Sequence, residues 1–155
     1  MGRSKIKVED LSEPEIDVLL EKLEPLTRKT TIEYKPYEKQ IPFHLSSKKI
    51  RVILGGNRSG KTFGANAETI MHASGYYPEW YPKHLRMKQP NNGRIVVTDF
   101  AKGFAETIQP MIEKWLPGDM VVNVKKNHEG YPSKYELSNG SRFDICTHEQ
   151  SDSVF

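Results

Sequence analysis

The residues best suited to chemistry lie between positions 55 and 62. Gly55, Gly60, Lys61 and Thr62 occupy the fixed positions of the pattern G-x-x-x-x-G-K-T. The glycines let successive backbone N–H groups point inward around phosphates, and a helix that opens at Gly60 adds its positive end. Lys61 then reaches the β- and γ-phosphates, and the Thr62 hydroxyl is placed to ligate Mg²⁺. The sequence therefore predicts a nucleotide-binding loop made of Gly55, Gly56, Asn57, Arg58, Ser59, Gly60, Lys61 and Thr62.

The segments on either side fit such a loop. Residues 50–54 form an apolar run that predicts a buried strand leading into it, and residues 62–72 predict a helix that ends at Gly75. A strand, a glycine-rich loop and a helix in this order are the setting that phosphate binding requires. The alternative, an accidental glycine-rich turn, does not account for this setting.

A glutamine upstream of the loop has aromatic neighbours. Gln40 lies between Tyr37 and Phe43, about 15 residues before the loop. An amide both donates and accepts, so Gln40 could pair with N6 and N7 of adenine while Tyr37 or Phe43 packs the ring. A packed surface loop explains the same residues, and on their own they favour that explanation.

The composition sets broad limits. A chain of 155 residues makes about one domain, and 36% hydrophobic with 28% charged residues is typical of a soluble globular protein. The single cysteine, Cys146, excludes an internal disulfide and fits a cytosolic protein. The net charge is only +3, but residues 41–100 hold nine basic and three acidic groups around the loop. This suits a polyanionic ligand without requiring nucleic acid.

The N-terminal part predicts a separate helix. Ser12 can cap it and Glu15 can complete a capping box. The apolar stripe of this helix of about 13 residues comprises Ile16, Leu19, Leu20 and Leu23. The stripe either packs on the main domain or docks a partner.

The middle of the chain predicts a loop, a strand and a helix. Residues 76–88 place aromatics before basic residues, which suits either nucleic-acid stacking or a loop covering the sheet. Residues 94–98 predict a second buried strand, and Asp99 after it resembles a degenerate Mg²⁺-binding strand end that lacks a following Glu. Residues 101–116 predict a helix kinked or started late by Pro110.

The last third predicts antiparallel structure. Residues 135–146 alternate around Asn139-Gly140, which favours a hairpin with a type I′ turn. Residues 120–124 predict a third antiparallel strand beside it. Only two segments, residues 50–54 and 94–98, suit a parallel sheet, too few for the sheet that such domains build.

Several of these residues together resemble a known family, the ATPase domain of phage large terminase subunits. The resemblance covers residues from about 34 to the end, and the N-terminal helix has no part in it. The residues that carry it are Tyr37, Gln40, Phe43, His44, residues 52–62, Glu68, Gly75, Tyr76, Tyr77, Pro78, Trp80, residues 137–143 and residues 147–155.

The resemblance implies the fold and its boundaries. We expect an α/β P-loop NTPase domain of the ASCE type, incomplete, with an antiparallel hairpin insertion and an N-terminal helix. Residues 1–33 would form the helix and connector. Residues 34–155 would be the N-terminal portion of the ATPase domain, truncated before the Walker B strand and without the nuclease domain.

The resemblance also implies a function and site roles. Such a motor uses ATP and Mg²⁺ to translocate double-stranded viral DNA into a procapsid. Its partners are that DNA, a portal protein, the small terminase subunit and further copies of itself in a homo-oligomeric ring. The motor works in the host cytoplasm, transiently at the procapsid portal, and involves no membrane. Lys61 and Arg58 would be catalytic, with Arg58 contacting the γ-phosphate, and Gln40 would read adenine beside Tyr37.

The residues leave two alternatives open. The chain shows no apolar strand ending in Asp-Glu, so we expect it alone to be inactive in ATP hydrolysis. A small P-loop kinase using Asp99 is one alternative, although it would need arginines in a lid and residues 101–155 contain only Arg142. A non-catalytic nucleotide-binding or interaction module is the other.

Overall fold

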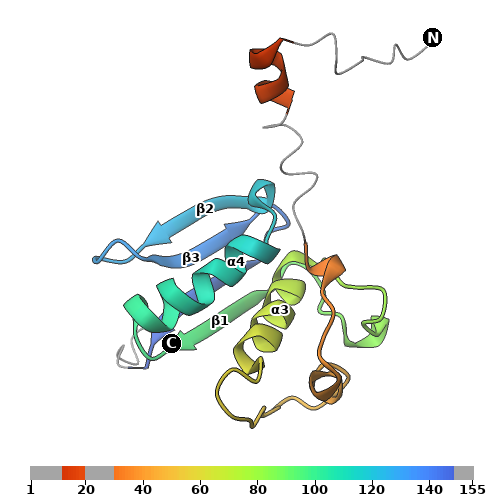
Figure 1. Cartoon of the computed structure of the whole chain (residues 1–155). Coiled ribbons are helices and arrows are strands. Elements are labelled where there is room, and N and C mark those ends of the chain that lie inside the picture. The colour runs from red at the N-terminus through yellow and green to blue at the C-terminus, as the bar shows by residue number, and fades with distance from the viewer. Residues whose placement is uncertain (1–11, 20–29, 149–155) are drawn as a thin grey trace, which may run out of the picture.

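The protein combines a mixed sheet with helices packed on it (Figure 1). The computed structural model describes residues 12–19 and 30–148. Four strands form one sheet: β1 (Asn92–Val97), β2 (Val121–Lys126), β3 (Pro132–Leu137) and β4 (Arg142–Thr147), in the order β1-β4-β3-β2. β1 runs parallel to β4, and the pairs β4·β3 and β3·β2 are antiparallel. The fold class is therefore α/β with a mixed sheet.

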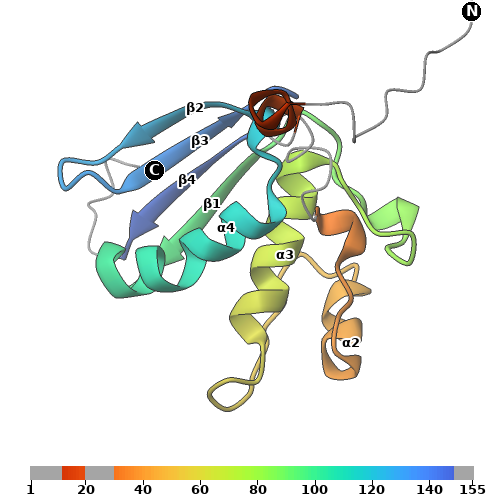
Figure 2. The same ribbon diagram turned by 45° about the horizontal axis from the view of Figure 1, so that its top comes forward.

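Two helical segments frame the sheet and the candidate site. α3 (Lys61–Ser74) begins after Gly60 and ends at Gly75, whose φ of 81° and N–H bond to Met71 O form a left-handed C-cap. The predicted helix at 62–72 is confirmed. Figure 2 shows α3 and α4 (Gln109–Trp115) on the same side of the sheet.

The helix predicted at 101–116 has two parts. A π-helical segment, η5 (Phe100–Ile108), precedes α4 and has Asp99 as its N-cap. Pro110 lies in the first turn of α4, where its missing N–H costs no helical bond. The remaining short elements are η2 (Thr31–Glu33), η3 (Glu38–Gln40), α2 (Ile41–His44), η4 (Lys83–Leu85) and η6 (Gly118–Met120).

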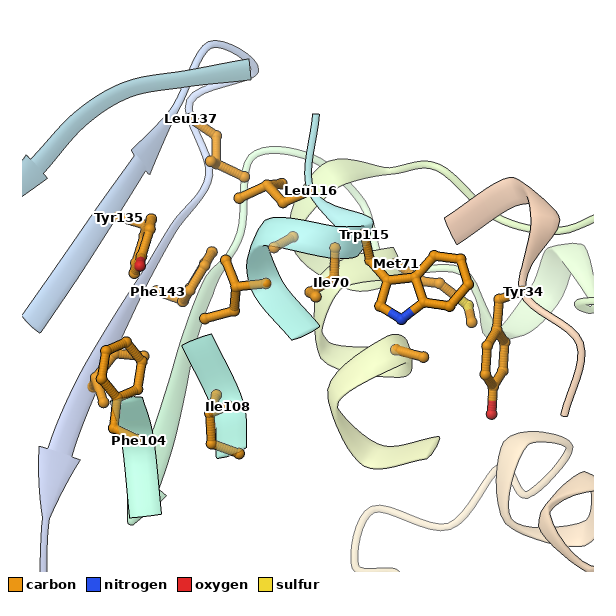
Figure 3. Close-up of a cluster of buried hydrophobic side chains, with 14 of the residues drawn as sticks. Tyr34, Ile70, Met71, Phe104, Ile108, Trp115, Leu116, Tyr135, Leu137 and Phe143 are labelled. Carbon is orange, nitrogen blue, oxygen red and sulfur yellow. The ribbon is translucent and has the colours of Figure 1, made fainter. Parts of the chain in front are cut away.

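The core lies between these helices and the sheet (Figure 3). Phe104 and Leu116 face Tyr135 and Phe143, whose rings stack at a centroid distance of 4.8 Å. Tyr34 belongs to the same buried cluster. Its other members include Ile70, Met71, Ile108, Ile112 and Trp115. The segment just before the candidate site is thus anchored in the same core.

The strand predicted at residues 50–54 is absent. Ile50, Val52 and Leu54 are 86%, 74% and 90% exposed, and none of the described strands pairs with this run. A cavity of about 420 Å³, bounded on one side by Arg51 and on the other by β1, adjoins the run. A strand exists only through hydrogen bonds to a neighbour, so apolar composition alone does not form one.

The predicted hairpin is present, but its turn is not type I′. That turn needs a positive φ at both central residues, and in the part of the chain that the structure describes Arg58 is the only non-glycine residue with one. Of the two central residues of this turn, only Gly140 has a positive φ, of 82°. Asn139 instead donates through Nδ2 to Ala73 O at 2.9 Å and Ser74 O at 3.1 Å, which ties the turn to α3. The hairpin is also no separate insertion, because β4 pairs with β1.

The other predicted elements compare closely with the structure. The strands predicted at 94–98 and 120–124 are β1 and β2, each shifted by one or two residues. Residues 13–19 are helical, and Glu15 accepts from the N–H of Ser12, as predicted for a capping box. The Ser12 hydroxyl donates to Glu15 as well, which differs from the predicted cap. Leu20 and Leu23 of the predicted stripe lie outside the described residues. Within residues 12–19 and 30–148, none of the helices has the length and apolar content needed to cross a membrane.

Candidate functional site

The loop at residues 55–60 surrounds a lysine ammonium group. Lys61 Nζ donates to Gly55 O and Gly56 O, both at 2.6 Å, and to Ser59 Oγ at 3.3 Å. The loop turns through two left-handed residues, Arg58 with φ 61° and Gly60 with φ 79°. The predicted loop residues are therefore gathered around one cationic group at the start of α3.

Lys61 and Thr62 line the 420 Å³ cavity that separates residues 51–53 from β1. Thr62 is exposed in the first turn of α3, where its hydroxyl faces solvent-accessible space. Asn57 and Arg58 are exposed on the loop. Among the described residues, none of those that line this cavity is acidic. The cavity brings the cation and the hydroxyl of the motif together without a carboxylate.

Gln40 contacts the loop directly. Its side chain is buried, and its Nε2 donates to Gly60 O at 2.7 Å. Its Oε1 accepts from Tyr37 N at 2.8 Å and from the Tyr34 hydroxyl at 3.3 Å. The amide oxygen thus accepts two hydrogen bonds, and one N–H of the amide fixes the end of the loop. Pairing with adenine stays a prediction, and it requires exchange of at least one of these bonds.

The two aromatics that flank Gln40 have different surroundings. Tyr37 is 65% exposed, and its ring lies against Gly60, where an added Cβ would come within 3.0 Å of Cε2. Phe43 is half-buried, and the Arg51 guanidinium covers its ring at 4.7 Å from the centroid. Tyr37 is therefore the ring that has a free face beside the loop.

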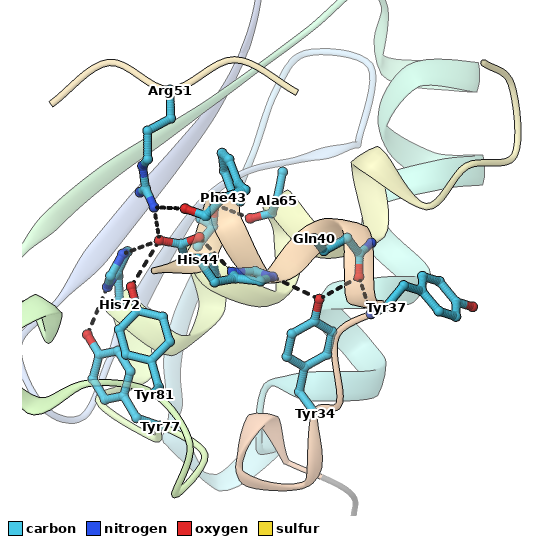
Figure 4. Close-up of polar contacts among 12 residues, drawn as sticks. Tyr34, Tyr37, Gln40, Phe43, His44, Arg51, Ala65, His72, Tyr77 and Tyr81 are labelled. Atoms are coloured by element: carbon cyan, nitrogen blue, oxygen red, sulfur yellow. Dashed lines mark hydrogen bonds and ion pairs between the residues drawn. The ribbon is translucent and has the colours of Figure 1, made fainter. Parts of the chain in front are cut away.

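A buried carboxylate on α3 is the centre of a polar network (Figure 4). Glu68, with its side chain 4% exposed, accepts four hydrogen bonds. The donors are His44 Nδ1 at 2.8 Å, Arg51 Nη1 at 2.6 Å, Tyr81 OH at 3.0 Å and His72 Nε2 at 3.2 Å. Burial by itself would raise the pKa of Glu68, but hydrogen bonds from the two histidines and Arg51, together with the Arg51 charge, hold it well below its usual range.

The network continues from Glu68 to the loop. His44 Nε2 lies 3.0 Å from the Tyr34 hydroxyl, which in turn contacts Gln40 Oε1. Burial raises the pKa of Tyr34, so this hydroxyl keeps its proton and its hydrogen bonds. Sequence reasoning gave Glu68 no role. The available signal was a carboxylate between Ala67 and Ile70, on the helix face that packs into the core.

Asp99 has a structural role in this conformation. Its Oδ1 accepts from Lys102 N at 2.6 Å and Gly103 N at 3.3 Å, and these bonds hold the pKa of Asp99 below its usual range. It lines a different cavity, of about 620 Å³, and does not line the one that contains Lys61. Asp99 is thus a helix cap rather than a partner of the loop.

The aromatic segment at 76–88 is largely packed. Tyr77 and Tyr81 are buried, and Tyr81 donates to Glu68. Arg86 covers the Tyr77 ring at 5.2 Å from the centroid and donates to Tyr81 O at 3.0 Å. Rings held in this way cannot stack on bases, which agrees with a packed loop. The contacts of the loop are with α3, however, and not with the sheet that it was predicted to cover.

No protein-family model, curated protein or solved structure matches this chain significantly. Among the described residues, no group of three or more His, Cys, Asp or Glu side chains is placed to hold a metal ion.

Proposed function

We propose that this chain is the ATP-binding part of a P-loop ATPase of the large terminase type. The observation that carries the proposal is the loop geometry, in which Lys61 lies inside the turn at residues 55–60 and α3 begins immediately after it. This geometry is the one that the sequence motif predicts, and it brings the lysine into the centre of the turn.

The residues of the loop fit a nucleotide phosphate. Lys61 Nζ is held by the carbonyl oxygens of Gly55 and Gly56, which are weaker partners for an ammonium group than phosphate oxygens. If phosphate oxygens replace these neutral carbonyls, their negative charge compensates the positive charge of Lys61. The first-turn N–H groups of α3 add donors at the same end. Thr62 would contribute its hydroxyl to Mg²⁺, whose chemistry is to neutralise phosphate charge.

The proposed roles of the remaining site residues follow from their positions. Tyr37 offers its free face to a base, and Gln40 would read adenine after releasing one present partner. Arg58 is exposed on the loop and can turn toward a γ-phosphate. We assign ATP rather than another nucleotide from Gln40 and the resemblance.

The P-loop ATPase fold accounts for the exposed run at residues 50–54. In that fold, the segment before the loop is a central strand with neighbours on both sides. Ile50, Val52 and Leu54 would then be buried, and the cavity between Arg51 and β1 would be filled by a further strand. Exposure of three apolar side chains to solvent is unfavourable, and this supports the assignment of residues 50–54 to a buried strand.

Catalysis is not part of the function proposed for this chain alone. Hydrolysis needs a carboxylate beside the metal and another beside the attacking water. Within residues 12–19 and 30–148, no acidic residue lines the cavity that contains Lys61 and Thr62. The chain would therefore bind Mg·ATP weakly and not hydrolyse it, and DNA translocation with a portal protein, a small subunit and a ring of copies belongs to the proposed whole motor.

A calorimetric titration tests the proposal. Mg·ATP is titrated into the chain, into Lys61→Ala and into Lys83→Ala, which removes an exposed lysine outside the loop. We expect binding to the wild type and to Lys83→Ala, and none to Lys61→Ala. Equal heats for the wild type and a folded Lys61→Ala would reject the loop assignment. Steady hydrolysis that is lost in Asp99→Ala would instead favour the kinase alternative.

A further inference from the structure

We propose that Glu68 is a positioning residue that clamps both ends of the phosphate-binding loop through one hydrogen-bond network. This inference rests on the proposed function. A loop that is already ordered loses less conformational entropy when a nucleotide binds, so such a clamp would favour binding. The Glu68 carboxylate would thus keep the loop ordered, although it lies two helical turns beyond Lys61 and does not contact the ligand.

The entry to the loop is held by an ion pair. Arg51 lies four residues before Gly55, in the run that has no strand partner. Its Nη1 donates to Glu68 Oε1 at 2.6 Å and to Phe43 O at 3.0 Å. These bonds replace the backbone ladder that would normally fix such a segment. The Arg51 side chain therefore ties the loop entry to α3, in addition to the bonds that Lys61 makes to Gly55 O and Gly56 O.

The exit from the loop is held through three further residues. Glu68 Oε2 accepts from His44, whose other ring nitrogen contacts the Tyr34 hydroxyl. Tyr34 contacts Gln40, and Gln40 Nε2 donates to Gly60 O at 2.7 Å. The same carboxylate is thus linked to Arg51, four residues before the loop, and, by way of this relay, to Gly60, the N-cap of α3.

The negative charge of Glu68 is what the network requires. The charge of Glu68 also acts on Tyr34 and Tyr77, which do not bond to it. The four groups that do bond to it are His44 of α2, Arg51 of the loop entry, His72 of α3 itself and Tyr81 of the 76–88 segment. All four are donors to it, and a carboxylate accepts at both oxygens. A neutral amide has one oxygen and an N–H₂ group, so Glu68→Gln removes the charge that faces Arg51 and keeps a bond to His44 only if Nδ1 of that ring gives up its proton and accepts.

The test measures loop order directly. Backbone ¹⁵N relaxation gives order parameters for the wild type, Glu68→Gln and Glu106→Gln, the last of which makes the same charge change on an exposed helical residue. We expect values at residues 55–60 to fall below about 0.6 in Glu68→Gln only, with values in β3 and β4 unchanged. A role in overall stability alone would not produce this local pattern. Unchanged values at residues 55–60 in a folded Glu68→Gln protein would overturn the proposal.

Single links can be cut if Glu68→Gln does not fold. Arg51→Met removes the entry tie, and Tyr34→Phe removes the hydroxyl between His44 and Gln40. We expect Arg51→Met to lower order at Gly55 and Gly56, and Tyr34→Phe to lower it at Gly60. Identical profiles in both variants and the wild type would contradict the clamp.

Ligand titrations separate this inference from the proposed function. We expect Glu68→Gln to weaken Mg·ATP and Mg·pyrophosphate by the same factor, about tenfold, because the clamp acts on the phosphate loop and not on the base. A loss confined to Mg·ATP would contradict the clamp. If neither ligand binds the wild type, the proposed function fails, while the order parameters still decide whether Glu68 holds the loop.

Discussion

Gly60→Ala tests how closely the loop end is packed against Gln40. Gly60 has a φ of +79°, and a Cβ built on it would lie 2.9 Å from Gln40 Nε2 and 3.0 Å from Tyr37 Cε2. Alanine is therefore strained by its backbone and also displaces the amide that donates to Gly60 O. Both effects act on the folded state.

The expected cost follows from these two contributions. A left-handed alanine costs about 1–2 kcal/mol, and a buried amide that loses its partner costs about 1–3 kcal/mol. Replacement of glycine restricts the unfolded chain and returns about 0.4–1 kcal/mol. We expect a net destabilisation of about 3 kcal/mol, which lowers the urea midpoint by about 1.5 M for a slope near 2 kcal/mol/M.

Gly56→Ala is the matched control for this measurement. Gly56 lies in the same loop, has no positive φ, and an added Cβ would meet no atom within 4 Å. We expect its urea midpoint to equal that of the wild type or to rise slightly, as followed by tryptophan fluorescence and circular dichroism. If Gly60→Ala and Gly56→Ala unfold at the same urea concentration, the described contact between Gly60 and Gln40 is wrong.

Three further predictions concern single side chains. Gln40→Ala should weaken ATP more than GTP in parallel calorimetric titrations if Gln40 reads adenine, whereas equal losses would leave it only the role of holding Gly60. The folded-state pKa of Glu68 is depressed, so its contribution to stability is present above its unfolded pKa of about 4.3 and is lost as the pH falls through the folded value. The difference in unfolding free energy between the wild type and Glu68→Gln should therefore shrink between pH 5 and pH 3 in urea titrations, and a constant difference would show that the carboxylate is not stabilised in this way. Asp99→Ala should lower the urea midpoint slightly through loss of a helix cap and leave Mg·ATP affinity unchanged, and a weaker affinity would return Asp99 to the metal site.

The sequence was sufficient where the determining interactions are local. α3 follows from its apolar spacing and from the glycine at position 75, and β3 and β4 follow from alternation on either side of Gly140. The gathering of the loop residues follows from the motif alone. In these cases each residue is positioned by neighbours only a few places away.

The sequence was insufficient where distant segments meet. The apolar run at 50–54 predicts a strand, but pairing is a property of two segments, and the described sheet ends at β1. The turn at Asn139 differs from the predicted type I′ turn because the Asn139 side chain bonds to the end of α3, 65 residues away along the chain. Glu68 could not be assigned because its donors lie on four separate segments. The parallel pairing of β1 with β4 is equally non-local.

The central claim is that the loop at residues 55–62 binds a nucleotide through its phosphates. The most direct measurement is a titration of Mg·ATP into ¹⁵N-labelled chain, followed by amide chemical shifts, because it detects weak binding and locates it. We predict that the largest shifts fall on Gly55 to Thr62, that Mg·pyrophosphate reproduces them, and that Lys61→Ala removes them. Shifts that avoid this loop, or none at millimolar Mg·ATP, would contradict the account.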